Sequence, residues 1–204
     1  MAKKTNKIKQ IQQKDIKAMA IISNCGHASH QQLSIHLKDN RIDAWRSRGV
    51  IEERSYRDVN GEYQTAYALT VKGKDFTKKH MGLDNHQSTN KKKTKHDVAV
   101  AKRYTSLSEQ ERSTYKNETV LRAEFKEHLM ELKHSNPTLH QEINNLYRSK
   151  QISTPDGAYT STSANGESVT VYAETITRNY KEQEIIAKHN YVAVMGGELQ
   201  MDRT

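Results

Sequence analysis

The feature that most constrains the fold of this chain is a pair of strand-like runs on either side of Asn60-Gly61. Residues 50–57 and 62–69 contain valine, isoleucine, threonine and tyrosine, which favour extended backbone. Asn-Gly tolerates the positive φ angles that a tight hairpin turn requires. The sequence therefore predicts a β-hairpin within residues 50–69.

Three helix-like segments precede this hairpin. The first, residues 13–22, places its apolar side chains near helical spacing. The second runs to residue 37 from an N-cap at Ser29, because a serine hydroxyl satisfies the free backbone N–H groups at a helix start. The third, residues 40–48, ends at Gly49.

Three short helices followed by a hairpin define a winged helix-turn-helix, a DNA-binding fold, which we expect over residues 11–80. Thr70 is expected to cap a further helix directly after the hairpin. The phrase Tyr67-Ala68-Leu69-Thr70-Val71-Lys72-Gly73 also resembles the Tyr-x-Leu-Thr-x-x-Gly ending of the wing in many bacterial members of this fold.

The charge of the chain is divided unevenly. The net charge is +9 over 204 residues, yet residues 1–100 hold 20 Lys/Arg against 10 Asp/Glu, whereas residues 101–204 hold 13 against 14. A basic field confined to one part of a chain is expected of a module that binds a polyanion. A surface kept positive only for solubility would spread its charge more evenly.

The rest of the chain has a different composition. Residues 81–95 are polar, end in a lysine-rich run and are expected to form a linker. Residues 96–204 are expected to form a second α+β domain, with helices packed on a small sheet. Its expected helices are 96–104, 117–134, 139–147 (capped by Thr138) and 177–188, and its expected strands are 168–176 and 191–195.

Several classes of protein are excluded or disfavoured by absent features. No apolar run is long enough to span a membrane, and the basic start of the chain lacks the apolar stretch of a secretory signal. We therefore expect a cytoplasmic protein without a membrane partner, in keeping with the single Cys25. Neither a nucleotide-binding glycine pattern nor a metal-ligand spacing is present, so no cofactor or metal is expected.

The histidines are interpreted in the same way. His27, His30 and His36 are expected at the surface or facing phosphate. Asp97, in the pair His96-Asp97, is expected to open a helix, where a carboxylate interacts favourably with the helix dipole.

The order of landmarks resembles that of the replication-relaxation family of bacterial plasmids, phages and conjugative elements. The matching residues are Leu69-Thr70 with Gly73, then His96-Asp97-Val98-Ala99-Val100, Pro155-Asp156-Gly157 and Val171-Tyr172-Ala173-Glu174. The resemblance implies a DNA-binding protein that acts in plasmid replication or in relaxing DNA for transfer.

The C-terminal landmarks are also similar to those of restriction-endonuclease-type nucleases. Asp156 and Glu174 would supply the two carboxylates that hold Mg²⁺ in such an enzyme. Ile176 occupies the position where the catalytic lysine is expected, and Lys181 and Lys188 follow on the next helix. The alternatives are an ordinary turn beside an exposed Glu174, or a degenerate nuclease fold; we expect no enzymatic activity.

The expected DNA contacts follow from helical spacing in the third helix. With Ile42 and Trp45 facing the core, Asn40, Asp43, Ala44 and Ser47 face outward, and Asn40 and Arg41 are the expected base readers. Arg54 and Arg57 are expected near the wing tip. Ser29 and Lys38 are expected to contact the sugar-phosphate backbone of the DNA. The complete expected set is Ser29, Lys38, Asn40, Arg41, Ser47, Arg48, Arg54 and Arg57.

The sequence thus predicts a sequence-specific double-stranded DNA-binding protein of a mobile genetic element. Its role is accessory or regulatory, in replication, DNA transfer or transcription, and the sequence does not choose among these. Residues 96–204 are expected to form a homodimer or to dock a relaxase or replication protein.

Overall fold

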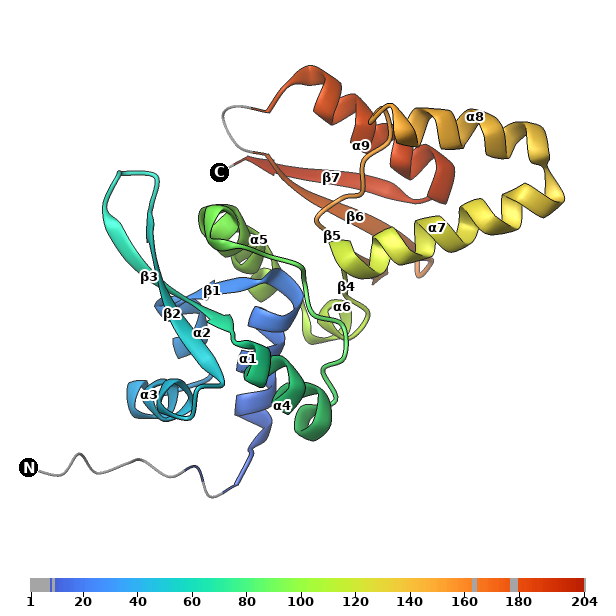
Figure 1. The fold of residues 1–204 in the computed structure, drawn as a ribbon. Helices are drawn as coiled ribbons and strands as arrows, with labels where there is room; N and C mark the ends of the chain where they lie inside the picture. The colour runs from blue at the N-terminus through green and yellow to red at the C-terminus, as the bar shows by residue number, and fades with distance from the viewer. Residues whose placement is uncertain (1–7, 9, 163–164, 177–179, 204) are drawn as a thin grey trace, which may run out of the picture. The chain divides into compact units, whose positions relative to one another are not determined.

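The computed structural model describes residues 8, 10–162, 165–176 and 180–203 and shows a mixed α and β protein (Figure 1). The chain divides into two compact units, Met1–Leu107 and Ser108–Thr204. No helix within the described residues is long and apolar enough to cross a membrane. The presence of both helices and strands confirms the expected α+β class.

The first unit places three helices before a β-hairpin. The strands β1, β2 and β3 form one antiparallel sheet in the order β1-β3-β2. Its elements are α1 (Gln13–Cys25), β1 (His27–Ser29), α2 (His30–Ser34), α3 (Asp39–Ser47), β2 (Ile51–Arg57), β3 (Tyr63–Leu69), α4 (Val71–Met81), the 3₁₀ turn η1 (Lys91–Lys93) and α5 (Thr94–Ser106). The three helices and the hairpin are confirmed, although α2 is shorter than expected.

Local signals at the ends of these elements account for the agreement. The Ser29 hydroxyl accepts from the Gln32 N–H at 3.2 Å and caps α2, and Thr70 accepts from the Gly73 N–H at 2.9 Å and caps α4. Gly61 has a φ of +84° in the hairpin turn, which a glycine adopts at little cost. Both expected caps are confirmed.

The segment expected as a linker is packed onto the first unit. Gln87 is buried, and its backbone N–H donates to the Ser23 carbonyl at 2.7 Å. His86 Nδ1 lies 2.8 Å from the Ser23 hydroxyl. These bonds fasten the segment to the end of α1, so the interpretation of residues 81–95 as a linker is corrected.

Helix α5 also belongs to the first unit, and a buried hydrogen bond explains why. Asp97 Oδ2 lies 2.8 Å from His27 Nδ1 on β1, and both side chains are buried. Asp97 lies in the first turn of α5, as the sequence predicted, and it also bonds to His27 inside the unit. The expectation that His27 lies at the surface is corrected. The boundary lies at Leu107, not at residue 95.

The second unit packs helices against a four-stranded sheet in the order β4-β5-β6-β7 (Figure 1). Strands β4, β5 and β6 pair antiparallel, and β7 runs parallel to β6. Its elements are α6 (Glu109–Ser113), β4 (Lys116–Asn117), α7 (Glu118–Ser135), α8 (Pro137–Arg148), β5 (Gly157–Thr162), β6 (Ser168–Ile176), α9 (Glu182–Met195) and β7 (Glu198–Arg203). Leu121 and Phe125 of α7 meet Tyr172 of β6 and Tyr191 of α9 in its core.

Two predictions for this unit are corrected. Tyr191 and Val192 lie within α9 where a strand was expected, because they are buried four residues after Ala187 and Lys188, which is helical spacing. The side chain of Asn136, not that of Thr138, caps α8. The start of the expected helix 177–188 includes residues 177–179, which lie outside the described residues.

Candidate nucleic-acid interface

The exposed face of α3 carries three of the four residues that were expected to face outward. Asn40, Asp43 and Ser47 are exposed, in agreement with the helical spacing of the sequence. Ala44, which was expected to join them, is 3% exposed and belongs to the core. The outer face of α3 is therefore narrower than expected, and it also includes Arg46.

Arg41 points toward α1 instead of projecting from α3. Its Nε and Nη2 atoms donate to the two carboxylate oxygens of Asp15 at 2.8 and 2.6 Å, and its guanidinium lies 5.8 Å from the centre of the Trp45 ring. Asp15 is fully buried. Burial opposes ionisation of this carboxyl, but hydrogen bonds from Arg41 and Trp45 outweigh it and hold the pKa of Asp15 below its usual value.

Arg46 is an exposed cation on α3 that was not among the predicted contact residues. Its guanidinium lies 2.9 Å from Asp43 and 2.5 Å from Glu53 of β2. The three-residue spacing from Asp43 was the available signal, because such residues share one face of a helix. Arg46 therefore links the outer face of α3 to the hairpin.

The two hairpin arginines lie on opposite faces of β2, since they are three residues apart and strand side chains alternate. Arg54 forms an ion pair with Glu52. Arg57, at the hairpin end of β2, donates to the Tyr63 hydroxyl at 2.9 Å and lies 4.7 Å from the centre of that ring. Of these two arginines, only Arg57 lies on the same face of β2 as Glu53, the residue that pairs with Arg46.

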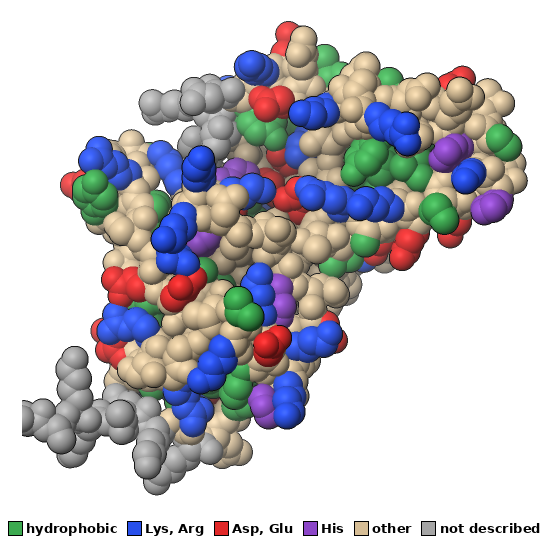
Figure 2. All heavy atoms as spheres, viewed as in Figure 1, with side chains coloured by type: hydrophobic (Ala, Val, Ile, Leu, Met, Phe, Trp, Pro, Cys, Tyr) green, Lys and Arg blue, Asp and Glu red, His purple; other side chains and the backbone are tan. Residues whose placement is uncertain are grey.

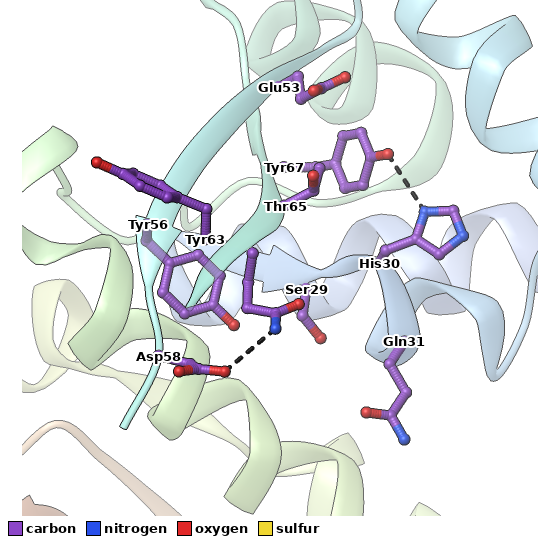
Figure 3. A pocket seen from close by; sticks show the side chains of 10 residues that line it. Ser29, His30, Gln31, Glu53, Tyr56, Asp58, Tyr63, Thr65 and Tyr67 are labelled. Carbon is purple, nitrogen blue, oxygen red and sulfur yellow. Dashed lines mark hydrogen bonds between the residues drawn. The ribbon is translucent and has the colours of Figure 1, made fainter. Parts of the chain in front are cut away.

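A polar hollow of about 520 Å³ lies between the start of α2 and the hairpin (Figure 3). Ten residues line it: Ser29, His30, Gln31, Glu53, Tyr56, Asp58, Tyr63, Gln64, Thr65 and Tyr67. None of these ten is a lysine or arginine, so any phosphate contacts must come from residues around it.

Side chains in the hollow are already oriented by one another. His30 Nδ1 lies 3.2 Å from the Tyr67 hydroxyl, and its Nε2 lies 3.1 Å from Asp39 on α3 (Figure 3 shows the first contact). Burial, and then the Glu53 carboxylate, raise the pKa of Tyr67. The phenol therefore remains protonated at neutral pH and can donate a hydrogen bond.

Three further predicted contact residues, Lys38, Arg48 and Ser29, lie at the ends of helices α2 and α3. Lys38 immediately precedes α3 and Arg48 immediately follows it, and both side chains are exposed. Within the part of the chain that the structure describes, neither forms an ion pair. The Ser29 hydroxyl is half-buried at the edge of the hollow, where it caps α2.

A separate polar cluster lies in the second unit, where Asp156, Glu174 and Lys188 meet. Glu174 is 1% exposed, which corrects its interpretation as an exposed strand residue. Lys188 Nζ of α9 lies 3.0 Å from Glu174 Oε1 and donates to the Thr154 carbonyl at 2.7 Å. The Asp156 N–H donates to Glu174 Oε2 at 3.0 Å.

The chemistry of this cluster depends on the state of Glu174. Burial, and then the Asp156 carboxylate, raise the pKa of Glu174 to about 7, although Lys188 opposes the shift. Ile176 is buried two residues after Glu174, as expected. The cluster thus has a lysine, but α9 supplies it instead of strand β6.

Comparison of the chain with protein-family models, with curated proteins and with solved structures gave no match.

Proposed function

We propose that this chain is a sequence-specific DNA-binding protein whose first unit forms a winged helix-turn-helix on a DNA duplex. The observation that carries the proposal is the order α1-β1-α2-α3-β2-β3 together with the sheet order β1-β3-β2. In a helix-turn-helix the second helix of the motif, here α3, enters the major groove.

The distribution of charge supports the same proposal. Residues 1–107 hold 22 Lys/Arg against 10 Asp/Glu. Asn40 and Ser47 are the proposed base readers on the exposed face of α3, because their side chains can donate to and accept from base edges. Lys38, Arg48 and Arg57 are the proposed phosphate contacts around it.

The geometry changes the set of residues that the sequence predicted. Arg41 is assigned to the core pair with Asp15, and Arg54 to the face of the hairpin turned away from Arg46. Ser29 is assigned to the cap of α2. We add Arg46, which a phosphate could draw away from Glu53.

Salt dependence tests the proposed phosphate contacts. Each phosphate neutralised on a duplex contributes a slope of roughly −0.9 to log K against log salt, because counterions are released. Lys38→Ala and Arg48→Ala should each reduce the magnitude of the slope by about that amount in the full chain. Lys133→Ala, an exposed lysine of α7, is the control; equal slopes for all four proteins would contradict the proposal.

The biological setting remains a proposal based on the family resemblance. An accessory or regulatory role in replication, transfer or transcription of a mobile element fits a DNA-binding unit joined to a second unit for homodimer formation or partner docking. A footprint over a promoter would favour transcription, and one over an origin would favour replication or transfer.

A second candidate function is metal-dependent phosphodiester hydrolysis, which the position of Lys188 favours. Mg²⁺ is commonly bound by one or two carboxylates together with water and substrate phosphate, so Asp156 and Glu174 fit it by donor type. Lys188 is the basic group that the sequence lacked two positions after Glu174. Against this candidate, Glu174 already accepts hydrogen bonds from Tyr180, Lys188 and the Asp156 N–H.

Incubation of supercoiled plasmid with the full chain and Mg²⁺ or Mn²⁺ tests the hydrolysis candidate. Nicking that disappears in Asp156→Ala and in Lys188→Met would establish hydrolysis. Intact plasmid in all lanes would remove this candidate and leave the cluster as a structural network. Nicking that persists in both variants would indicate a contaminant or another site.

A further inference from the structure

A basic groove of about 1140 Å³ lies in the second unit among α7, α8, α9 and residues 149–154. Six Lys/Arg and two Glu line it, although residues 108–204 as a whole hold 11 Lys/Arg against 14 Asp/Glu. Figure 2 shows Lys and Arg side chains grouped around a hydrophobic patch in the region of α7, α8 and α9. The positive charge of an otherwise acidic unit is therefore concentrated at the groove.

Four of the six lining cations, Lys181 among them, form no ion pair within the described residues. Lys126 of α7, Arg148 of α8 and Lys150 are exposed, and none of them has an ion-pair partner among the described residues. The other lining cations include Arg122, which pairs with Glu118, and Lys188, which pairs with Glu174. Lys126, Arg148 and Lys150 can thus meet an anionic ligand without giving up an existing ion pair.

Lys150 also occupies an unusual backbone conformation. Its φ of +61° is the only positive value among the non-glycine residues that the structure describes. The position follows the end of α8, where a left-handed residue is usually glycine because a side chain is strained there. A lysine at this position adds a cation at the edge of the groove at some cost in stability.

The lining is apolar as well as basic. Tyr147 of α8 lines the groove from a half-buried position, with its ring centre 5.1 Å from that of Phe125. Ile186 of α9 lines it as well and is 50% exposed. Aromatic rings beside cations form the usual surface for single-stranded nucleic acid, where bases stack on the rings and phosphates meet the cations.

We propose that this groove binds a single strand of DNA, with phosphates on Lys126, Arg148 and Lys150 and a base on Tyr147. The groove volume suits a few nucleotides of one strand, whereas a duplex would lie across its mouth and leave Tyr147 without a base to stack on. The choice of DNA rests on the proposed function of the first unit. The groove adds a second activity: the chain holds duplex DNA and a separated strand at once.

Fluorescence anisotropy of the full chain with a labelled oligothymidine strand of about 12 nucleotides tests the proposal. An excess of unlabelled duplex is present to occupy the first unit. Lys126→Ala and Arg148→Ala should each reduce the magnitude of the salt slope by about 0.7, the value for one phosphate of a single strand. Lys133→Ala, on the same helix as Lys126 but outside the groove, should leave the salt slope unchanged.

Two further variants separate binding from folding. Lys150→Gly should weaken strand binding while the melting temperature stays equal or rises, because glycine relieves the left-handed backbone. Tyr147→Leu should weaken binding roughly fivefold or more through lost stacking.

The proposal is overturned if the groove variants bind the strand like the parent chain. The proposal is also overturned if the groove variants lose affinity for the duplex alone. Tighter binding of the corresponding single-stranded RNA than of the DNA strand would overturn it as well. Failure of the duplex proposal would be seen in a separate titration of the chain with duplex, which would then show no binding.

Discussion

Arg41 on α3 and Asp15 on α1 form an ion pair through two hydrogen bonds, with the Asp15 carboxylate fully buried. Asp15 also accepts from the Trp45 indole N–H at 3.0 Å, and Arg41 donates to the Gln10 carbonyl at 2.7 Å. A cation that the sequence predicted in the DNA groove therefore holds the proposed recognition helix to the body of the first unit.

Loss of this pair should destabilise the first unit. Arg41→Ala leaves Asp15 buried without its cation, a change that commonly costs about 3–5 kcal/mol. We expect a loss of this size in urea unfolding, whereas Arg48→Ala, an exposed arginine at the end of the same helix, should change stability by less than about 0.5 kcal/mol. Equal, small effects for both variants would show that Arg41 is not a structural residue.

The second unit should lose stability as the pH rises from 4.5 to about 7. The pKa of Glu174 is raised from 4.5 to about 7 by burial and Asp156, so the folded chain keeps a proton that the unfolded chain has released. The contribution of this group is complete below pH 4.5 and is lost as the pH rises through about 7.

Substitution of Glu174 tests this dependence. Unfolding free energies of the parent and Glu174→Gln should be measured across this pH range, with Glu142→Gln, an exposed glutamate of α8, as the control. The decline should be absent from Glu174→Gln and present in the control. A decline of the same size in all three proteins would contradict the assignment to Glu174.

A fragment that ends at Leu107 should fold, and one that ends at residue 95 should not. The shorter fragment lacks α5 and with it Asp97, the buried partner of His27. It also lacks Val100, Ala101 and Tyr104, which are buried in the first unit. Thermal unfolding followed by circular dichroism should be cooperative for residues 1–107 only; matching transitions would place the boundary back at residue 95.

The sequence was sufficient for elements that have a strong local signal. The Asn60-Gly61 turn and the caps at Ser29 and Thr70 depend on neighbouring residues, and all were predicted. Strand β1 has only three residues, too few for an alternating pattern. The 191–195 run was wrongly assigned to a strand, because a short apolar segment suits a helix or a strand equally.

Pairing over long sequence distances explains the errors at the site. The partners of Arg41 and Asp97 lie 26 and 70 residues away, and no local pattern indicates that either side chain points inward to bond to them. The same limit applies to the groove of the second unit, whose cations come from three helices, the loop after α8 and the N-cap of α9. The net charge of residues 101–204 concealed it, because acidic residues elsewhere cancel these cations.

Base reading in the major groove is proposed for Asn40 and Ser47 of α3. A preferred duplex is first selected from a random library with the parent chain, and affinities for that duplex and for random DNA are then measured. Asn40→Ala should lower the ratio of the two affinities roughly fivefold to 150-fold, equivalent to about 1–3 kcal/mol, with little change on random DNA. An unchanged ratio in both Asn40→Ala and Ser47→Ala would contradict the claim.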